Sequence, residues 1–130
     1  MSKQEKNIKL AKTRGNEPLF RSVYCAIYPI IHKSARDLGY ALTVHGSLER
    51  DFDIVAIPWS QDCANWRDLV RGIMESTDFI RSDFFDDDIF NPPHCEEKPH
   101  NRVAISIPIR AGMYFDLSVI KPIREKLIQN

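Results

Sequence analysis

Two apolar alternations near the carboxyl end constrain the fold of this chain more than any other feature. The apolar positions are Val103, Ile105, Ile107 and Ile109 in the first run, and Met113, Phe115, Leu117 and Val119 in the second. Because successive side chains of a strand point to opposite faces, this period predicts two strands that each bury one face. The residues between the runs, Arg110-Ala111-Gly112, predict a hairpin turn. Pro108 predicts that the first of these strands lies at an edge of the sheet.

Two helices are expected to pack on the apolar face of that sheet. The clearer helix spans residues 64–75, where apolar side chains recur at helical spacing. These side chains are Trp66, Leu69, Val70, Ile73 and Met74. The other helix is expected over residues 28–38, because Pro29 fits a first helical turn and Gly39 favours a helix end.

The remaining segments complete the expected fold. Two more strands are predicted over residues 40–45 and 52–57, whereas residues 77–100 lack any period, which predicts an irregular loop. This order predicts an α+β fold, in which two main helices cover a mixed or antiparallel sheet of about four to five strands. Residues 1–17 are polar and lysine-rich and predict a flexible basic arm, followed by a single domain over residues 18–130.

Composition narrows the cellular setting of the protein. The chain of 130 residues carries 18 basic and 18 acidic residues, so its bulk charge gives no argument for nucleic-acid or membrane binding. Its three cysteines, an odd number without close pairing, suit a reducing compartment. No run approaches the ~18 consecutive apolar residues of a membrane-spanning helix. We therefore expect a cytoplasmic protein without a membrane partner.

Three aspartates are candidate metal ligands. Asp51 and Asp53 alternate at the start of the second strand and therefore project to the same side. Asp116 stands between the apolar neighbours Phe115 and Leu117, so it projects away from the core. If the second and last strands are neighbours, the three carboxylates converge, and a divalent cation relieves their repulsion. Hard oxygen ligands of this kind suit Mg²⁺ or Mn²⁺.

The turn before the acids has the residue types of a phosphate-binding loop. Gly46 lets backbone N–H groups approach a phosphate, and Ser47 adds a hydroxyl donor. Arg50 adds a positive charge that can contact a phosphate or neutralise Asp51 or Asp53. The sequence therefore predicts a nucleotide or phosphate site at Gly46, Ser47 and Arg50.

These motifs together resemble the polymerase-beta-like nucleotidyltransferase superfamily. The shared features are Gly-Ser after a strand, Asp-x-Asp at the next strand and a lone Asp between hydrophobic residues on a later strand. A closer resemblance is to small uncharacterised proteins that are common in phage and prophage genomes. Those proteins carry runs similar to residues 39–59, 98–102 and 114–119, and the similarity spans roughly residues 28–120.

The resemblance implies a minimal nucleotidyltransferase domain and a metal-dependent reaction. It implies that Asp51 and Asp53 ligate the metals, that Asp116 binds the metal that activates the nucleophile, and that Ser47 holds the triphosphate. Implied partners are Mg²⁺ or Mn²⁺, a nucleoside triphosphate, and a host protein or nucleic acid as acceptor. A phage-encoded chain would act in the host cytoplasm.

Simpler interpretations remain open for the same residues. Asp51 and Asp53 can be solvated acids at a strand start, and Gly46-Ser47 can be an ordinary turn. His45, beside the motif, is either a base or an ordinary histidine at a strand end.

Two wider alternatives also remain. His94, Cys95 and His100 invite a zinc interpretation, although their spacing fits no standard site. Three residues separate Ser47 from Asp51, fewer than in typical nucleotidyltransferases. This short gap favours an alternative function, a catalytically reduced phage-encoded module that binds a nucleotide or inhibits a host protein.

Overall fold

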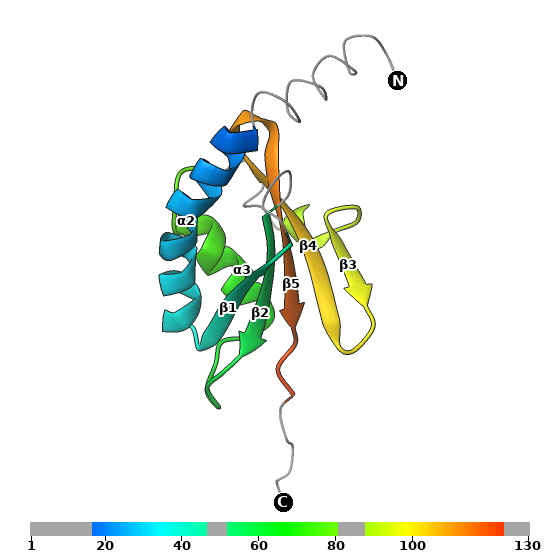
Figure 1. Cartoon of the computed structure of the whole chain (residues 1–130). Helices are drawn as coiled ribbons and strands as arrows, with labels where there is room; N and C mark the ends of the chain where they lie inside the picture. The colour runs from blue at the N-terminus through cyan, green and yellow to red at the C-terminus, as the bar shows by residue number, and fades with distance from the viewer. Residues whose placement is uncertain (1–16, 47–51, 81–87, 124–130) are drawn as a thin grey trace, which may run out of the picture.

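The computed structural model describes residues 17–46, 52–80 and 88–123 (Figure 1). The elements are α2 (Glu17–Asp37), β1 (Tyr40–His45), β2 (Phe52–Pro58), α3 (Trp66–Glu75), the 3-10 turn η2 (Asp88–Phe90), β3 (Cys95–Lys98), β4 (Arg102–Ile109), the 3-10 turn η3 (Arg110–Gly112) and β5 (Met113–Ile120). The expected α+β class is confirmed. All but the last residue of the expected arm over residues 1–17 lies outside the described ranges.

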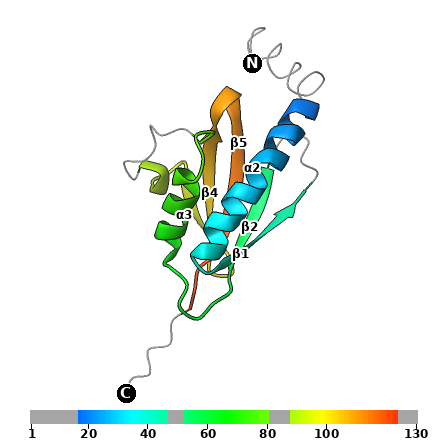
Figure 2. The same ribbon diagram turned by 90° about the vertical axis from the view of Figure 1, so that its left-hand side faces the viewer.

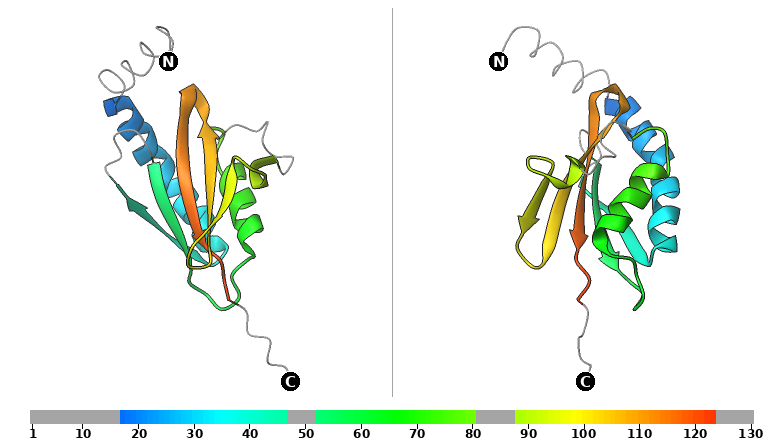
Figure 3. Two further views of the ribbon diagram at one scale, coloured as in Figure 1. Left: turned by 90° about the vertical axis from the view of Figure 1, so that its right-hand side faces the viewer. Right: turned by 180° about the vertical axis from the view of Figure 1, so that it is seen from behind.

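The five strands form one mixed sheet in the order β1-β2-β5-β4-β3. β1 and β2 are antiparallel, as are β4 with β5 and β3 with β4. β2 and β5, which are distant in the sequence, pair in parallel at the centre of the sheet. The left panel of Figure 3 shows the strands from the side that carries no helix. The expected mixed sheet and the hairpin turn at residues 110–112 are both confirmed.

α2 and α3 pack on one face of the sheet (Figures 1 and 2). Alternate strand residues, such as Ile54 and Phe115, are fully buried beneath the helices. The intervening residues form what we call the uncovered face of the sheet. Its members in the two central strands are Asp53, Val55 and Ile57 of β2, and Tyr114, Asp116, Ser118 and Ile120 of β5.

The expected start of the first helix near residue 28 is wrong, because α2 begins at Glu17 and contains Pro29 in its interior. A proline inside a helix costs about 3 kcal/mol. Burying a large apolar side chain contributes about 1.5–3 kcal/mol. Tyr24, Ile27 and Ile31 lie on one stripe of α2 and are fully buried, whereas Pro29 points outward. The long apolar stripe therefore outweighs the proline.

The second helix closely follows the expectation for residues 64–75. Asn65 caps α3, since its side-chain oxygen accepts a hydrogen bond of 2.9 Å from the backbone N–H of Asp68. Leu69 and Ile73 are fully buried against the sheet and α2. Because the cap lies at Asn65, the helix begins at Trp66 rather than at residue 64.

Residues 77–100 were expected to be irregular, yet their described part contains η2 and the strand β3. β3 has four residues, three of them charged (Glu96, Glu97 and Lys98), so it shows no apolar alternation. β3 forms one edge of the sheet, and β4, the strand that contains Pro108, lies between β3 and β5. The expectation that Pro108 marks an edge strand is therefore wrong. β3 pairs only with β4 as far as Ile105, and Pro108 therefore lies beyond its end.

Candidate functional site

Two of the three candidate acids meet at the centre of the uncovered face. Asp53 of β2 and Asp116 of β5 are directly paired across the parallel strands. Neighbouring strands lie about 4.8 Å apart, so the two residues are adjacent. Their preceding neighbours, Phe52 and Phe115, are paired in the same way and are buried in the core beneath the helices. The expected convergence is therefore confirmed for Asp53 and Asp116.

Gly46 belongs to the same end of the sheet. It follows β1 and has a φ of +83°, a conformation that residues with a Cβ rarely adopt. A Cβ at this position would lie 2.8 Å from Oδ2 of Asp53. The positive φ therefore favours glycine here, whereas the Asp53 carboxylate is the end of a side chain that could shift to admit a Cβ. Ser47, Arg50 and Asp51 lie outside the described residues, so their expected roles remain predictions.

His45 lies beside the acids. It is the last residue of β1, it is exposed, and its partner across the antiparallel pair is Asp53. Alternation along β1 places His45 on the uncovered face, because Tyr40 and Leu42 are buried on the other. An imidazole on the same face as two carboxylates can exchange a proton with a bound ligand, so the base interpretation of His45 remains open.

Two polar residues of β4 also belong to this face, and of these Ser106 was missed in the sequence. Ser106 is paired with Asp116, which puts a hydroxyl-bearing residue next to the acids. Arg102 donates a hydrogen bond of 3.2 Å from Nη1 to Oγ of Ser118, one alternation further along β5. Counting back from the turn at residues 110–112 across the antiparallel pair would have identified Ser106 from the sequence. Ser106 and Arg102 thus add a hydroxyl and a positive charge to the face that carries the two carboxylates.

Tyr114 supplies an aromatic surface at the other side of Asp116. Its side chain lies two residues before the aspartate on the same face and is 46% exposed. A half-exposed ring beside two acids is an arrangement on which a planar ligand can stack. Along β5, the uncovered face therefore runs from an aromatic ring, past the acid pair, to Ser118 and its arginine partner.

The chemistry of the acid pair suits a hard divalent cation. Carboxylates on directly opposed strand positions repel one another, and a cation with oxygen ligands offsets that repulsion. Among the described residues, no three His, Cys, Asp or Glu side chains are grouped as metal ligands. Asp51, the third acid of the expected set, is not among those residues. The described part of the site therefore supplies two carboxylates for a metal.

The zinc interpretation of His94, Cys95 and His100 is not supported. Burial raises the pKa of the Cys95 thiol, and the negative charge of Glu97 acts in the same direction. Within the part of the chain that the structure describes, these three side chains do not gather as a group of metal ligands. Cys95 packs against the core at the sheet edge instead.

Comparison with known proteins adds no assignment. Neither helix of the described chain is both long and apolar enough to cross a membrane. No protein-family model, no curated protein and no solved structure matches this chain.

Proposed function

We propose that this protein is a metal-dependent nucleotidyltransferase-like enzyme that transfers a nucleotidyl group to an acceptor. The observation that carries the proposal is the direct pairing of Asp53 with Asp116 on the uncovered face. Gly46 beside the Asp53 carboxylate supports it, since this turn can bring backbone N–H groups to a phosphate.

The residues of the uncovered face divide the work of such a reaction. Asp53 and Asp116 would hold Mg²⁺ or Mn²⁺, together with Asp51. Bound there, the metal would polarise the phosphoryl oxygens and neutralise charge in the transition state. His45, whose strand partner is Asp53, would accept the proton of the acceptor hydroxyl. Tyr114 offers a ring against which a nucleobase can stack.

Thermal unfolding tests the metal site first. Ligand at 100 times its dissociation constant stabilises the native state by about 2.7 kcal/mol, so Mg²⁺ or Mn²⁺ should raise the melting temperature. Asp53→Asn and Asp116→Asn should each abolish most of that shift. Asp78→Asn is the matched control, because Asp78 is an exposed aspartate in the segment after α3. Equal shifts in all three variants would contradict the metal site.

Turnover is tested separately. The protein is incubated with Mn²⁺ or Mg²⁺ and each labelled nucleoside triphosphate, alone and with host extract, and transfer of label is followed. We expect transfer that Asp53→Asn reduces at least a hundredfold and that Asp78→Asn leaves unchanged. The enzyme would be ruled out if none of the labelled nucleotides supported transfer, or if Asp53→Asn transferred label as well as the wild-type protein.

A second candidate is a module that binds a nucleotide or a host protein without catalysis. The observation that favours it is the apolar character of the uncovered face around the acids, where Tyr114 is 46% exposed and Val55 and Ile57 are half-buried. Calorimetry separates the two functions. Nucleotide binding that persists in EDTA and in Asp53→Asn, but is lost in Tyr114→Ala, would favour the module. Binding that requires both metal and Asp53 favours the enzyme.

A further inference from the structure

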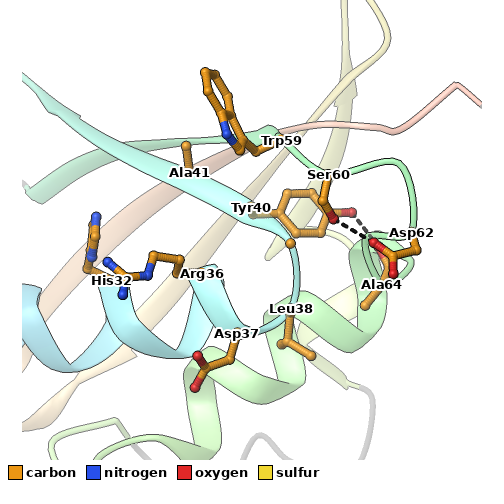
Figure 4. A pocket seen from close by; sticks show the side chains of 11 residues that line it. His32, Arg36, Asp37, Leu38, Tyr40, Ala41, Trp59, Ser60, Asp62 and Ala64 are labelled. Atoms are coloured by element: carbon orange, nitrogen blue, oxygen red, sulfur yellow. Dashed lines mark hydrogen bonds between the residues drawn. The ribbon is translucent and has the colours of Figure 1, made fainter.

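A cavity of about 480 Å³ lies at the opposite end of β1 and β2 from the acid pair (Figure 4). It opens between the last turns of α2, the start of β1 and the segment that follows β2. Trp59 on its rim is six positions after Asp53, and at ~3.3 Å per strand residue the two lie roughly 20 Å apart. Its volume falls within the range of about 300–1,000 Å³ that is usual for small-molecule sites. The cavity is therefore separate from the proposed metal site.

One wall of this cavity is held in place by backbone hydrogen bonds. The carbonyl of Gly39 accepts from the N–H groups of Trp59, at 2.8 Å, and Ser60, at 3.1 Å. The hydroxyl of Tyr40, which lines the cavity, donates at 2.7 Å to the carbonyl of Ala64. The segment after β2 is thus tied to the end of α2 and the start of β1. A wall fixed in this way loses little conformational entropy when a ligand binds.

The opposite wall carries the guanidinium of Arg36. His32 and Arg36 are one helical turn apart on α2, and Figure 4 shows their side chains on the same side of the cavity. Arg36 is exposed, and within the described residues no hydrogen bond or ion pair joins its guanidinium. That group is therefore available to an anion.

The two acids of the lining are already engaged. Asp37 accepts a hydrogen bond of 2.8 Å from Lys33, which lowers the pKa of Asp37. Asp62 keeps its negative charge, accepts one of 2.9 Å from the hydroxyl of Ser60, and lies on the segment after β2 rather than on the α2 wall (Figure 4). With Asp37 balanced by Lys33, Arg36 has no bonded counter-charge in the cavity, so the α2 wall favours an anionic ligand.

Trp59 supplies an aromatic side chain at the mouth of the cavity. Its side chain is 81% exposed at the rim, whereas its backbone N–H is fixed by Gly39. An indole held at the mouth of a cavity offers a large flat surface for stacking with another ring.

We propose that this cavity binds a small planar aromatic anion, with its ring against Trp59 and its carboxylate or phosphate on Arg36. The site is independent of the acid pair and of the function proposed above. An aromatic carboxylate and a nucleoside monophosphate share the required chemistry. They differ in the anionic group, which separate titrations distinguish.

Fluorescence can report binding at Trp59 directly. The chain has two tryptophans, so Trp66→Phe leaves Trp59 as the only indole. This protein is titrated with two matched pairs, AMP with adenosine and phenylacetate with phenylacetamide. We expect a saturable change in emission with at least one anion, and an affinity at least tenfold lower for its neutral counterpart. The anion that binds identifies whether the site takes a phosphate or a carboxylate.

Arg36→Gln tests the assigned contact. We expect it to lower the affinity for the anion about tenfold, whereas Arg21→Gln should have no effect. Arg21 is the matched control because it is exposed on the same helix, far from the cavity. If Trp66→Phe does not fold, the two indole N–H resonances of the native protein report the same titrations. Absence of saturable binding by every probe, or equal affinities for Arg36→Gln and Arg21→Gln, would overturn the proposal.

Discussion

The two faces of the central sheet are built from the same strands but differ in almost every property. On the covered face, Ile54, Phe115 and Leu117 are at most 1% exposed and pack under the two helices. On the uncovered face, the alternate residues include Asp53 and Asp116, paired at the centre of the sheet. Because successive side chains of a strand point to opposite faces, neighbouring residues serve different purposes: one packs in the core, and the next is available to a ligand. Changes on one face should alter folding, and changes on the other should alter ligand binding.

The largest expected effect comes from adjacent residues of β5 that face opposite ways. Phe115 is fully buried and its ring centroid lies 6.0 Å from that of Phe52. Phe115→Ala should lower the free energy of unfolding by about 3–5 kcal/mol. Tyr114→Ala, on the uncovered face, should stay within about 0.5 kcal/mol of wild type. Urea unfolding measures both, and similar losses in the two variants would refute the division between the faces.

The next effect concerns the connection from α2 to β1. Gly39 has a φ of +92°, and a Cβ there would lie 2.7 Å from the Cα of Cys63. Gly39→Ala should cost at least about 1–3 kcal/mol, because the conformation is unfavourable and backbone must shift. Gly72→Ala is the control, since its Cβ would meet the movable tip of Leu38. Urea midpoints that fall equally in the two variants would contradict this account.

A smaller effect is expected from one hydroxyl on each side of β1. The hydroxyl of Tyr28 in α2 donates a hydrogen bond of 2.9 Å to the carbonyl of Leu42. Tyr28→Phe should therefore lower the free energy of unfolding by about 0.5–1.5 kcal/mol. Thr43→Val removes an exposed hydroxyl from the uncovered face and should change stability by less than about 0.5 kcal/mol. Thermal unfolding at one pH measures the loss of stability in both variants. A larger loss in Thr43→Val than in Tyr28→Phe would contradict the prediction.

The smallest effect is expected on the outer surface of α2, far from either face of the sheet. Lys33 lowers the pKa of Asp37 below its usual 3.8 through a hydrogen bond of 2.8 Å. A depressed carboxyl pKa contributes stability that is present above pH 3.8 and is lost as the pH falls through the folded-state value. Lys33→Gln should thus be marginally less stable than wild type at pH 7 and indistinguishable well below pH 3.8. A difference that grows on acidification would reverse the assigned sign.

The helix and strand predictions succeeded where the pattern was long and failed where it was broken or short. The stripe of Leu69, Val70, Ile73 and Met74 identified α3 because four buried positions repeat at helical spacing. The first half of α2 was missed, since Pro29 is a local signal against a helix and the burial that outweighs it depends on the sheet. β3 was missed because an edge strand of four residues with charged side chains has no apolar period.

The candidate site was predictable where it depends on a single strand or hairpin, and not where it depends on contacts between separate elements. The outward direction of Asp53 and Asp116 followed from their apolar neighbours. Ser106 could have been found by counting across the hairpin from Gly112, whereas Arg102 was expected only as part of a motif. The cavity at Arg36 and Trp59 could not have been found from the sequence, because its walls come from three separate elements.

The sequence alone determined which side chains of each strand point to the core, because alternation depends only on the local backbone geometry. It therefore determined that Asp53 and Asp116 project away from the apolar face. Only the tertiary structure decided that β2 and β5 are parallel neighbours and that these two aspartates are directly paired. Strand order depends on the combined packing of both helices and all five strands, and no local pattern encodes that sum.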